Sequence, residues 1–321
     1  VLVLIGITLA VSANGLCMVF TEYEVMLWLR LLAGIGSGIY TAIAIVTLGA
    51  TCKPARAFTW LLFAFAFTQA LEMQVLPQLS MNSIYGVFIT MYLISLLFLH
   101  WVPPRAAGEA LDVEMDVTDK QGIHHHIYQH IPTYAPWLSL SAIFAIYVCI
   151  GAYWTYIELA NLNAGVDDAW INTSLVWGSF MSILGCLFAT FISNRVGMAR
   201  PLMVALLSMA LVVSMMIGGV TNIGLFVMIC LFNFLWFFID VYQMGTISTL
   251  DPSGRYVSLV PGAQGVGQIV GPNLAATVLS YELGYDGVFF MCACAAVVAL
   301  IIYGVMYVRL KRIIPALADA S

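Results

Sequence analysis

Apolar residues in this chain form long runs that short polar breaks separate. The runs hold about 20 residues each, which is the length that an α-helix needs to cross the hydrocarbon of a bilayer. A membrane β-barrel would instead alternate apolar and polar positions over segments of about ten residues, and the sequence shows no such alternation. The pattern therefore predicts an all-α polytopic transmembrane helical bundle with ten spans: Val1–Phe20, Val25–Ala50, Ala57–Leu76, Ile84–Val102, Trp137–Ile157, Ala169–Ile192, Pro201–Val220, Ile223–Leu250, Val257–Ser280 and Gly287–Val308.

The composition agrees with a chain that lies in a lipid bilayer. Of its 321 residues, 62% are hydrophobic and 8% are charged, which leaves too few polar side chains to cover a water-soluble globule. The net charge of −5 comes from acidic residues in the connections, and no basic patch indicates nucleic acid as a partner. The seven cysteines lie in or beside spans, so we expect them to pack as small apolar residues.

The basic residues indicate how the spans are oriented. They fall in every second connection and in the C-terminal tail, whereas the other connections hold acidic residues without Lys or Arg. Since Lys and Arg near span ends stay on the cytoplasmic side, we expect both chain ends to be cytoplasmic, in a plasma membrane. The residues assigned to this side are Lys53, Arg56, Arg105, Lys120, Arg195, Arg200, Arg255, Arg309, Lys311 and Arg312.

One long connection divides the spans into four and six. We expect a partial N-terminal helical half at 1–102, a central cytoplasmic loop at 103–136 and a C-terminal six-helix half at 137–321. The loop holds His124, His125, His126 and His130 without a Cys partner, so we interpret it as a solvated segment rather than a metal site. We expect no metal and no cofactor.

The second span carries an arginine one turn before a glycine series, in the pattern Arg30-x-x-x-Gly34-x-Gly36-x-Gly38. This pattern resembles one in the fourth helix of the major facilitator superfamily, whose long cytoplasmic loop follows the sixth helix. Here the long loop follows the fourth span. The resemblance therefore implies that about ten of the family's twelve helices are present, that the first four are its third to sixth, and that two helices precede Val1.

Two weaker motifs agree with this resemblance. The segment with Arg195, Gly197 and Arg200 is similar to the second copy of the family's cytoplasmic Asp-Arg-x-Gly-Arg-Arg signature, with Asn194 in place of the acid. The ninth span contains Gly267-x-x-x-Gly271-Pro272, which is similar to a pattern in the fifth helix of the family's antiporters. The fifth-helix equivalent here, Ala57–Leu76, lacks that pattern, so the direction of transport does not follow from a motif.

Three ionisable residues fall inside the predicted spans, namely Arg30, Glu72 and Asp240. A charge at mid-membrane costs about 2.5–3.5 kcal/mol, and such residues usually have a function. Asp240 is about 16 Å from the next cytoplasmic turn and is our first candidate for carrying a proton, with Glu72 the second and Arg30 as an organising charge. The structural alternatives are a snorkelling arginine, an interfacial Glu72 and an Asp240 that neighbouring helices satisfy.

Polar and aromatic side chains at helical spacing are candidates for lining a cavity: Gln69, Trp154, Asn233, Trp236, Gln243, Gln264 and Gln268. For Trp154 and the nearby Tyr153, an aromatic belt at the outer surface is the ordinary interpretation. For Gln264 and Gln268, helix packing is an equal alternative. The glycines of the second and ninth spans predict close helix contacts.

These features and the resemblance together imply a secondary active transporter that moves a small solute by alternating access, with protons as the coupling ion, as a monomer. A neutral or cationic solute is favoured over a multiply charged anion, which would need more than Arg30 to offset its charge. A non-transporting sensor on the same scaffold is one alternative. A membrane-embedded enzyme is another, but it would need clustered catalytic groups that the sequence lacks.

Overall fold

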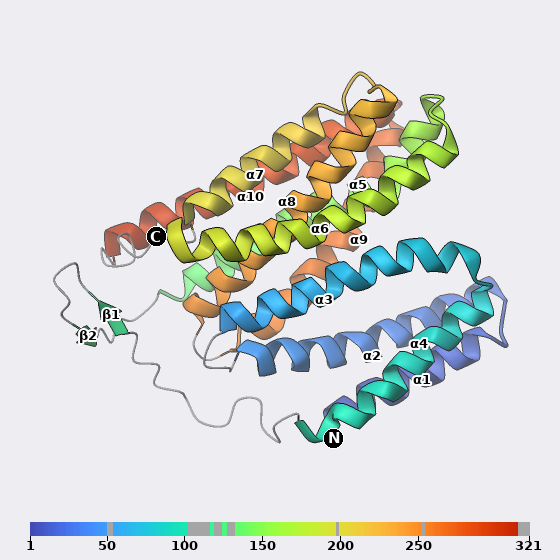
Figure 1. The fold of residues 1–321 in the computed structure, drawn as a ribbon, viewed down its shortest axis with the longest axis horizontal. Helices are drawn as coiled ribbons and strands as arrows, with labels where there is room; N and C mark the ends of the chain where they lie inside the picture. The colour runs from blue at the N-terminus through green and yellow to red at the C-terminus, as the bar shows by residue number, and fades with distance from the viewer. Residues whose placement is uncertain are drawn as a thin grey trace.

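The computed structural model describes residues 1–49, 54–101, 116–118, 124–126, 132–196, 199–251 and 254–313. Within this part of the chain, each of the ten predicted spans corresponds to one α-helix, and the predicted helical bundle is confirmed (Figure 1). The helices are α1 (Leu2–Cys17), α2 (Tyr23–Gly49), α3 (Pro54–Val75), α4 (Met81–Ser95), α5 (Tyr134–Asn163), α6 (Asp168–Val196), α7 (Ala199–Ser214), α8 (Asn222–Leu250), α9 (Val260–Ser280) and α10 (Gly284–Ile313). Three 3-10 helices accompany them: η1 (Leu76–Gln78), η2 (Leu96–Trp101) and η3 (Val257–Leu259).

Two features differ from the expectation. The loop predicted at 103–136 contains an antiparallel hairpin of β1 (Asp116–Thr118) and β2 (His124–His126), so the described chain is not purely helical. In addition, α5 continues to Asn163, six residues beyond the predicted end at Ile157. Hydropathy marks where a chain leaves the apolar layer, whereas the helix itself ends only near Gly165, whose φ of +80° suits a glycine after a helix end.

Length and apolarity vary among the helices. Six of the described helices are long and apolar enough to cross a membrane: α2, the helical stretch of α4 with η2, α5, α6, α8 and α10. The apolar helices α1 and α7 are shorter, with 16 residues each. The longer α3 and α9 hold Gln, Glu or several Gly residues, which lowers their apolarity. Of the helices long and apolar enough to span, α5 and α8 are the most buried within the described chain.

Side chains satisfy the backbone at several helix ends. The Thr221 hydroxyl accepts a hydrogen bond from the Gly224 N–H at 3.2 Å and so caps the start of α8. At the other end of α8, the Asp251 carboxylate accepts hydrogen bonds from the backbone N–H groups of Tyr256 and Val257. This turn leads directly into η3 and α9, and it fixes the direction in which the chain returns.

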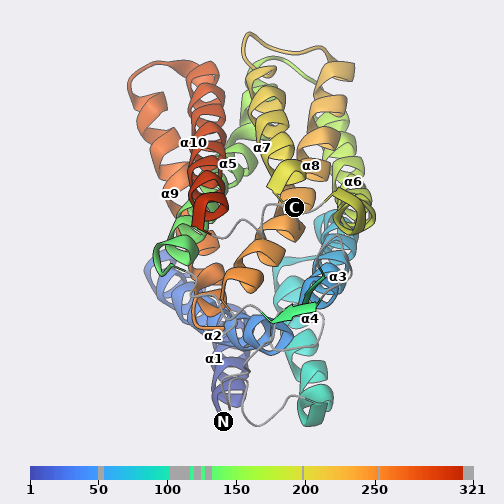
Figure 2. The same ribbon diagram turned by 90° about the vertical axis from the view of Figure 1, so that its left-hand side faces the viewer.

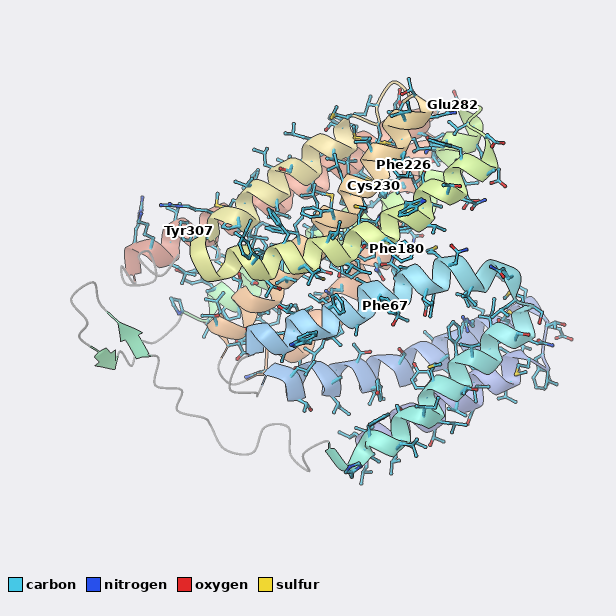
Figure 3. All side chains as sticks on the ribbon, in the orientation of Figure 1. Phe67, Phe180, Phe226, Cys230, Glu282 and Tyr307 are labelled. Atoms are coloured by element: carbon cyan, nitrogen blue, oxygen red, sulfur yellow. The ribbon has the colours of Figure 1, made fainter. Side chains whose placement is uncertain are left out.

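The last six helices form two packed groups. α9 and α10 pack along α5, α6 packs along α8, and α7 contacts both α8 and α10. Figure 2 shows α5, α9 and α10 on one side and α6, α7 and α8 on the other. Glycines allow the closest approaches: a Cβ at Gly267 of α9 would lie 2.7 Å from the Phe144 carbonyl oxygen of α5, and one at Gly185 of α6 would lie 3.2 Å from the Phe234 Cα of α8.

The first four helices meet the last six mainly at one end of the bundle, where α7 begins and α8 and α10 end (Figure 1). We call it the basic end, because Arg200 lies in the first turn of α7, Arg255 follows α8 and Arg309 lies in the last turns of α10. The end of α2 packs on η3, and the first part of α3 packs on α6 and α8. Toward the opposite end, called the acidic end after Asp168 and Asp286, the ribbons of α3 and α6 diverge (Figure 1). The buried residues of α3 follow this geometry, because they are Phe58, Leu62, Ala66 and Ala70, whereas the later Leu71 and Val75 are exposed.

Candidate functional site

A buried carboxylate lies at the junction of three helices in the C-terminal part of the bundle. Asp240 of α8 is 3% exposed, and the Tyr147 hydroxyl of α5 donates a hydrogen bond to its Oδ2 at 2.8 Å. The same tyrosine oxygen accepts hydrogen bonds from Gln264 Nε2 of α9 at 2.9 Å and from Trp236 Nε1 of α8 at 3.5 Å. We call these four residues the Asp240 cluster.

The second carboxylate oxygen of Asp240 has no hydrogen-bond partner. Oδ1 is buried and unpaired among the described residues, and no Lys or Arg of the described chain forms an ion pair with this carboxylate. A buried carboxylate without a counter-charge is costly, so it needs a bound proton, a cation or a hydrogen-bond donor. Oδ1 is therefore the atom of this cluster at which such a group would bind.

Side chains on both sides of the cluster extend it along the bundle axis. Gln243, one turn from Asp240 toward the basic end, is 1% exposed, and its amide lies beside the Tyr303 hydroxyl of α10. Toward the acidic end, the Trp154 ring of α5 meets the Trp236 ring edge to face, with 6.0 Å between centroids. The Trp154 indole N–H is buried without a partner among the described residues. Trp154, Trp236 and Gln243, all predicted as cavity residues, thus lie next to Asp240.

The aromatic-belt interpretation is wrong for Tyr153. This side chain is 1% exposed and stacks on Phe232 of α8 with 3.6 Å between ring centroids, inside the bundle. The reason is the extra length of α5, which adds about 9 Å of helix beyond Ile157 at 1.5 Å per residue. Residues that seemed to lie at the span end therefore lie deeper.

The candidates in the first four helices lie apart from the Asp240 cluster. Glu72 is exposed on α3, and Gln69 is half-buried with an unpaired Oε1 among the described residues. α3 reaches α8 through Phe65, whose ring stacks on Phe237 at 5.7 Å. Glu72 is seven residues, or about 10 Å, farther along this helix. The structure therefore does not bring the two candidate acids together.

Arg30 of α2 joins two neighbouring helices. Its Nη1 donates a hydrogen bond to Asn14 Oδ1 of α1 at 3.1 Å, and its guanidinium lies 5.3 Å from the ring centroid of Tyr85 of α4. Asn14 and Tyr85 are each 4% exposed, whereas Arg30 itself is exposed. Arg30 is thus held by specific partners at the helix contact that the glycine series predicted.

The predicted packing residues divide into two sets. A Cβ at Gly36 would lie 2.6 Å from the Gly6 carbonyl oxygen of α1, and one at Gly271 would lie 2.9 Å from the Ala152 nitrogen of α5. Gly34 and Gly38, by contrast, have no described neighbour within 4 Å. Pro272 lies inside α9.

The other predicted polar residues have varied positions. Asn233 is fully buried, with its Nδ2 bonded to the Ile229 carbonyl at 2.9 Å and its Oδ1 accepting from Ser182 of α6 at 3.4 Å, so it serves helix packing. Gln268 is exposed. Within the loop motif, Arg195 falls in α6, Arg200 is exposed at the start of α7, and Gly197 lies outside the described residues.

Tyr147 is the residue of this site that the sequence did not single out. It follows Ile146 and precedes Val148 in an apolar run, so no motif or polar stripe marks it. The fifth span holds five tyrosine or tryptophan residues, namely Trp137, Tyr147, Tyr153, Trp154 and Tyr156. Their spacing in the sequence does not distinguish the one that meets Asp240.

Comparison with known protein families agrees with this architecture. The sequence model of the Major Facilitator Superfamily matches residues 1–255, which is most of the chain. The chain belongs to the Major Facilitator Superfamily. The comparison with the curated proteins found no matching sequence.

Solved structures of Major Facilitator Superfamily proteins share the fold. The human organic anion transporter MFSD10 (TETRAN) matches with a TM-score of 0.67 and 14% identity, over 94% of this chain and 76% of that protein. The E. coli fucose:proton symporter FucP matches with a TM-score of 0.63 and 16% identity, over 95% and 83%. A bacterial homologue of the iron transporter ferroportin, in an outward-facing state, matches with a TM-score of 0.59 and 12% identity, over 96% and 83%. At these identities the likeness shows the fold, that of a multi-pass integral membrane transporter.

Proposed function

We propose that this chain moves a small solute across a plasma membrane by proton-coupled alternating access, with Asp240 as the proton-carrying group and Glu72 as the second candidate. The observation that carries this proposal is the Asp240 carboxylate, which is 3% exposed and has one oxygen without a partner among the described residues. Intramembrane acids of transporters serve as proton relays. The FucP neighbour, named a fucose:proton symporter, is a proton-coupled example of the fold.

In alternating access, such a carboxylate binds and releases a proton once in each transport cycle. When the cavity opens to one side, Asp240 takes up a proton and becomes neutral, which removes the cost of an unpaired buried charge. The loaded protein then changes conformation, and the proton leaves on the other side. Because the neutral and charged states differ in their interaction with the site, proton binding shifts the conformational equilibrium.

The side chains around Asp240 favour a neutral or cationic solute. Trp154 and Trp236 offer π faces, which attract organic cations and pack well against apolar rings. Gln243 and Gln264 offer amide groups to hydroxyls or amines. The Asp240 carboxylate would repel a multiply charged anion, because no Lys or Arg of the described chain is paired with that carboxylate.

Accumulation in proteoliposomes tests the function. The panel holds radiolabelled monosaccharides, organic amines and organic anions. With the inside of the vesicles made alkaline or acidic relative to the outside, we expect the purified full chain to accumulate at least one monosaccharide or amine. The organic anions of the panel should not accumulate. If no panel member moves in either direction while the purified protein still binds one of them, the sensor alternative replaces the transporter.

We also propose that the basic end faces the cytoplasm and that the protein works as a monomer. Lys and Arg at span ends are retained inside, so the first four and last six helices touch on the cytoplasmic side and diverge on the outside. This arrangement is that of an outward-open transporter.

Thiol labelling in intact cells tests this orientation. Ala164→Cys lies at the acidic end after α5, in a backbone conformation that any residue adopts, and Ala107→Cys lies in the 103–136 connection. In a background without reactive native cysteines, an impermeant maleimide should label only Ala164→Cys, and permeabilised cells should show labelling at both sites. Labelling of Ala107→Cys alone in intact cells contradicts the orientation.

A further inference from the structure

The contact between α5 and α8 differs from the other contacts within the last six helices. α5 is held to α9 by close glycine approaches, such as Gly151, where a Cβ would lie 2.8 Å from Gln268 Cα, and to α10 by the Ser139–Tyr303 hydroxyl pair at 3.4 Å. These contacts are directional or tightly packed. They make α5, α9 and α10 one unit, which we call the α5 group.

The α6 and α8 helices form a second unit, the α8 group. Ser182 of α6 donates to Asn233 of α8 at 3.4 Å, and the Tyr242 hydroxyl of α8 donates to the Ala189 carbonyl of α6 at 3.4 Å. A Cβ at Gly178 of α6 would lie 2.6 Å from Ile229 Cγ2 of α8. These two helices are therefore also packed too closely to slide past each other.

Few directional contacts join the two groups. In the described part of the chain, Tyr147 makes both hydrogen bonds between α5 and α8, to Asp240 and from Trp236. At the acidic end, the Asp286 carboxylate of α10 accepts from the Gly218 N–H before α8 at 3.0 Å. Between these two links lie ring contacts such as Tyr153 on Phe232, which have no donor or acceptor to align. Beyond Asp240 toward the basic end, α8 turns into η3 and α9 at Asp251, which accepts hydrogen bonds from the Tyr256 and Val257 N–H groups, and the Gln243 amide lies beside the Tyr303 hydroxyl. The bond on Asp240 is thus the hydrogen bond that joins α5 to α8 within the bundle.

We infer that Tyr147 is a positioning residue that converts the protonation of Asp240 into movement of the α8 group relative to the α5 group. A hydrogen bond to an ionised carboxylate is about twice as strong as one between neutral groups. Charged Asp240 therefore holds α8 against α5, and protonated Asp240 releases it. Because α8 is tied near the acidic end by the Asp286 bond and at the basic end by the Asp251 turn, its release lets α6 and α8 move away from α5 around Tyr147. Gln264 directs the tyrosine hydroxyl and keeps it on α9 in both states.

This inference rests on the proposed proton coupling at Asp240. The titratable groups close enough to interact with the Asp240 charge are Tyr147 of α5, Cys186 of α6 and Tyr303 of α10. The facing residues of α9 and α3, Gln264 and Phe65, do not titrate. Within the described chain, Cys186 and Tyr303 form no hydrogen bond with the carboxylate oxygens, so Tyr147 is the titratable neighbour that bonds directly to Asp240.

The experiment measures distances between spin labels with protons as the only ligand. Labels at Ser141→Cys of α5 and Leu187→Cys of α6, both exposed toward the basic end, report on the two groups. A second pair, Ser141→Cys with Val308→Cys of α10, lies within the α5 group. When the pH falls from about 8 to about 5, we expect the first pair to shift to longer distances and the second pair to stay unchanged.

Variants distinguish the role of the Tyr147 hydrogen bond from that of Asp240 protonation. Tyr147→Phe at about pH 8 should give the distances that the parent shows at about pH 5, without a further shift on acidification. Tyr153→Phe, which removes a buried hydroxyl with no partner among the described residues, should respond to pH as the parent does. An acid response that persists in Tyr147→Phe, or is absent from the parent, overturns the inference. If the acid response persists in both Tyr147→Phe and Asp240→Asn, the proposed proton site is wrong as well. If the response persists in Tyr147→Phe but is lost in Asp240→Asn, Asp240 remains the proton site and only the role of Tyr147 is wrong.

Discussion

Asp240→Asn is expected to abolish solute accumulation driven by a pH gradient. A pH difference of one unit is worth about 1.4 kcal/mol per proton, so coupling one proton to one solute supports about tenfold accumulation. The amide keeps the size of the carboxylate and can still accept from the Tyr147 hydroxyl, but it does not titrate. The accumulation ratio in proteoliposomes should therefore fall from about tenfold to about one.

Equilibrium exchange distinguishes lost coupling from lost folding. Exchange of solute at equal concentrations on both sides need not move a proton, so Asp240→Asn should keep part of it. Glu72→Gln is the matched comparison, because Glu72 is an intramembrane acid that does not contact the Asp240 cluster. If both variants still accumulate the solute when pH alone is stepped, coupling through these acids is wrong.

Arg30→Ala is expected to impair transport far more than membrane insertion. The substitution removes the hydrogen bond to Asn14 and the cation–π contact with Tyr85, which join α2 to α1 and α4. A hydrogen bond from a charged group is worth about 1.5–3 kcal/mol and an exposed cation–π contact about 0.5–1 kcal/mol, so we expect the initial transport rate to fall by about tenfold or more. The amount of protein in the membrane should stay near that of the parent, since removal of a charge favours insertion.

Arg309 provides the control for this prediction. Its guanidinium lies 5.9 Å from the ring centroid of Tyr134, so Arg309→Ala removes a similar contact, but at the basic end of α10. Its transport rate should change by less than about twofold, as for an exposed contact. Equal rates in Arg30→Ala and the parent would show that Arg30 only anchors its helix at the interface.

Much of the architecture follows from sequence alone. A span is decided by the summed apolarity of about 20 residues, a quantity that no single tertiary contact reverses. Each predicted span therefore became one helix, although helix ends such as that of α5 differ by several residues, because polar residues can continue a helix beyond the apolar layer. Intramembrane charge is equally visible, and it marked Asp240 and Arg30 before any partner was known.

The partners of these charges were decided by packing. Successive residues of a helix point in directions about 100° apart, so a small rotation of α5 would turn Tyr147 away from Asp240. That rotation is set by glycines on other helices, such as Gly267, against which Tyr147 itself packs. The sequence identifies a polar residue on one helix, but the residue it meets depends on contacts between helices that are far apart in the chain. For this reason Asp240 was predictable from residue order and hydropathy, whereas its bond to Tyr147, and the exposed position of Glu72 on α3, came only with the tertiary structure.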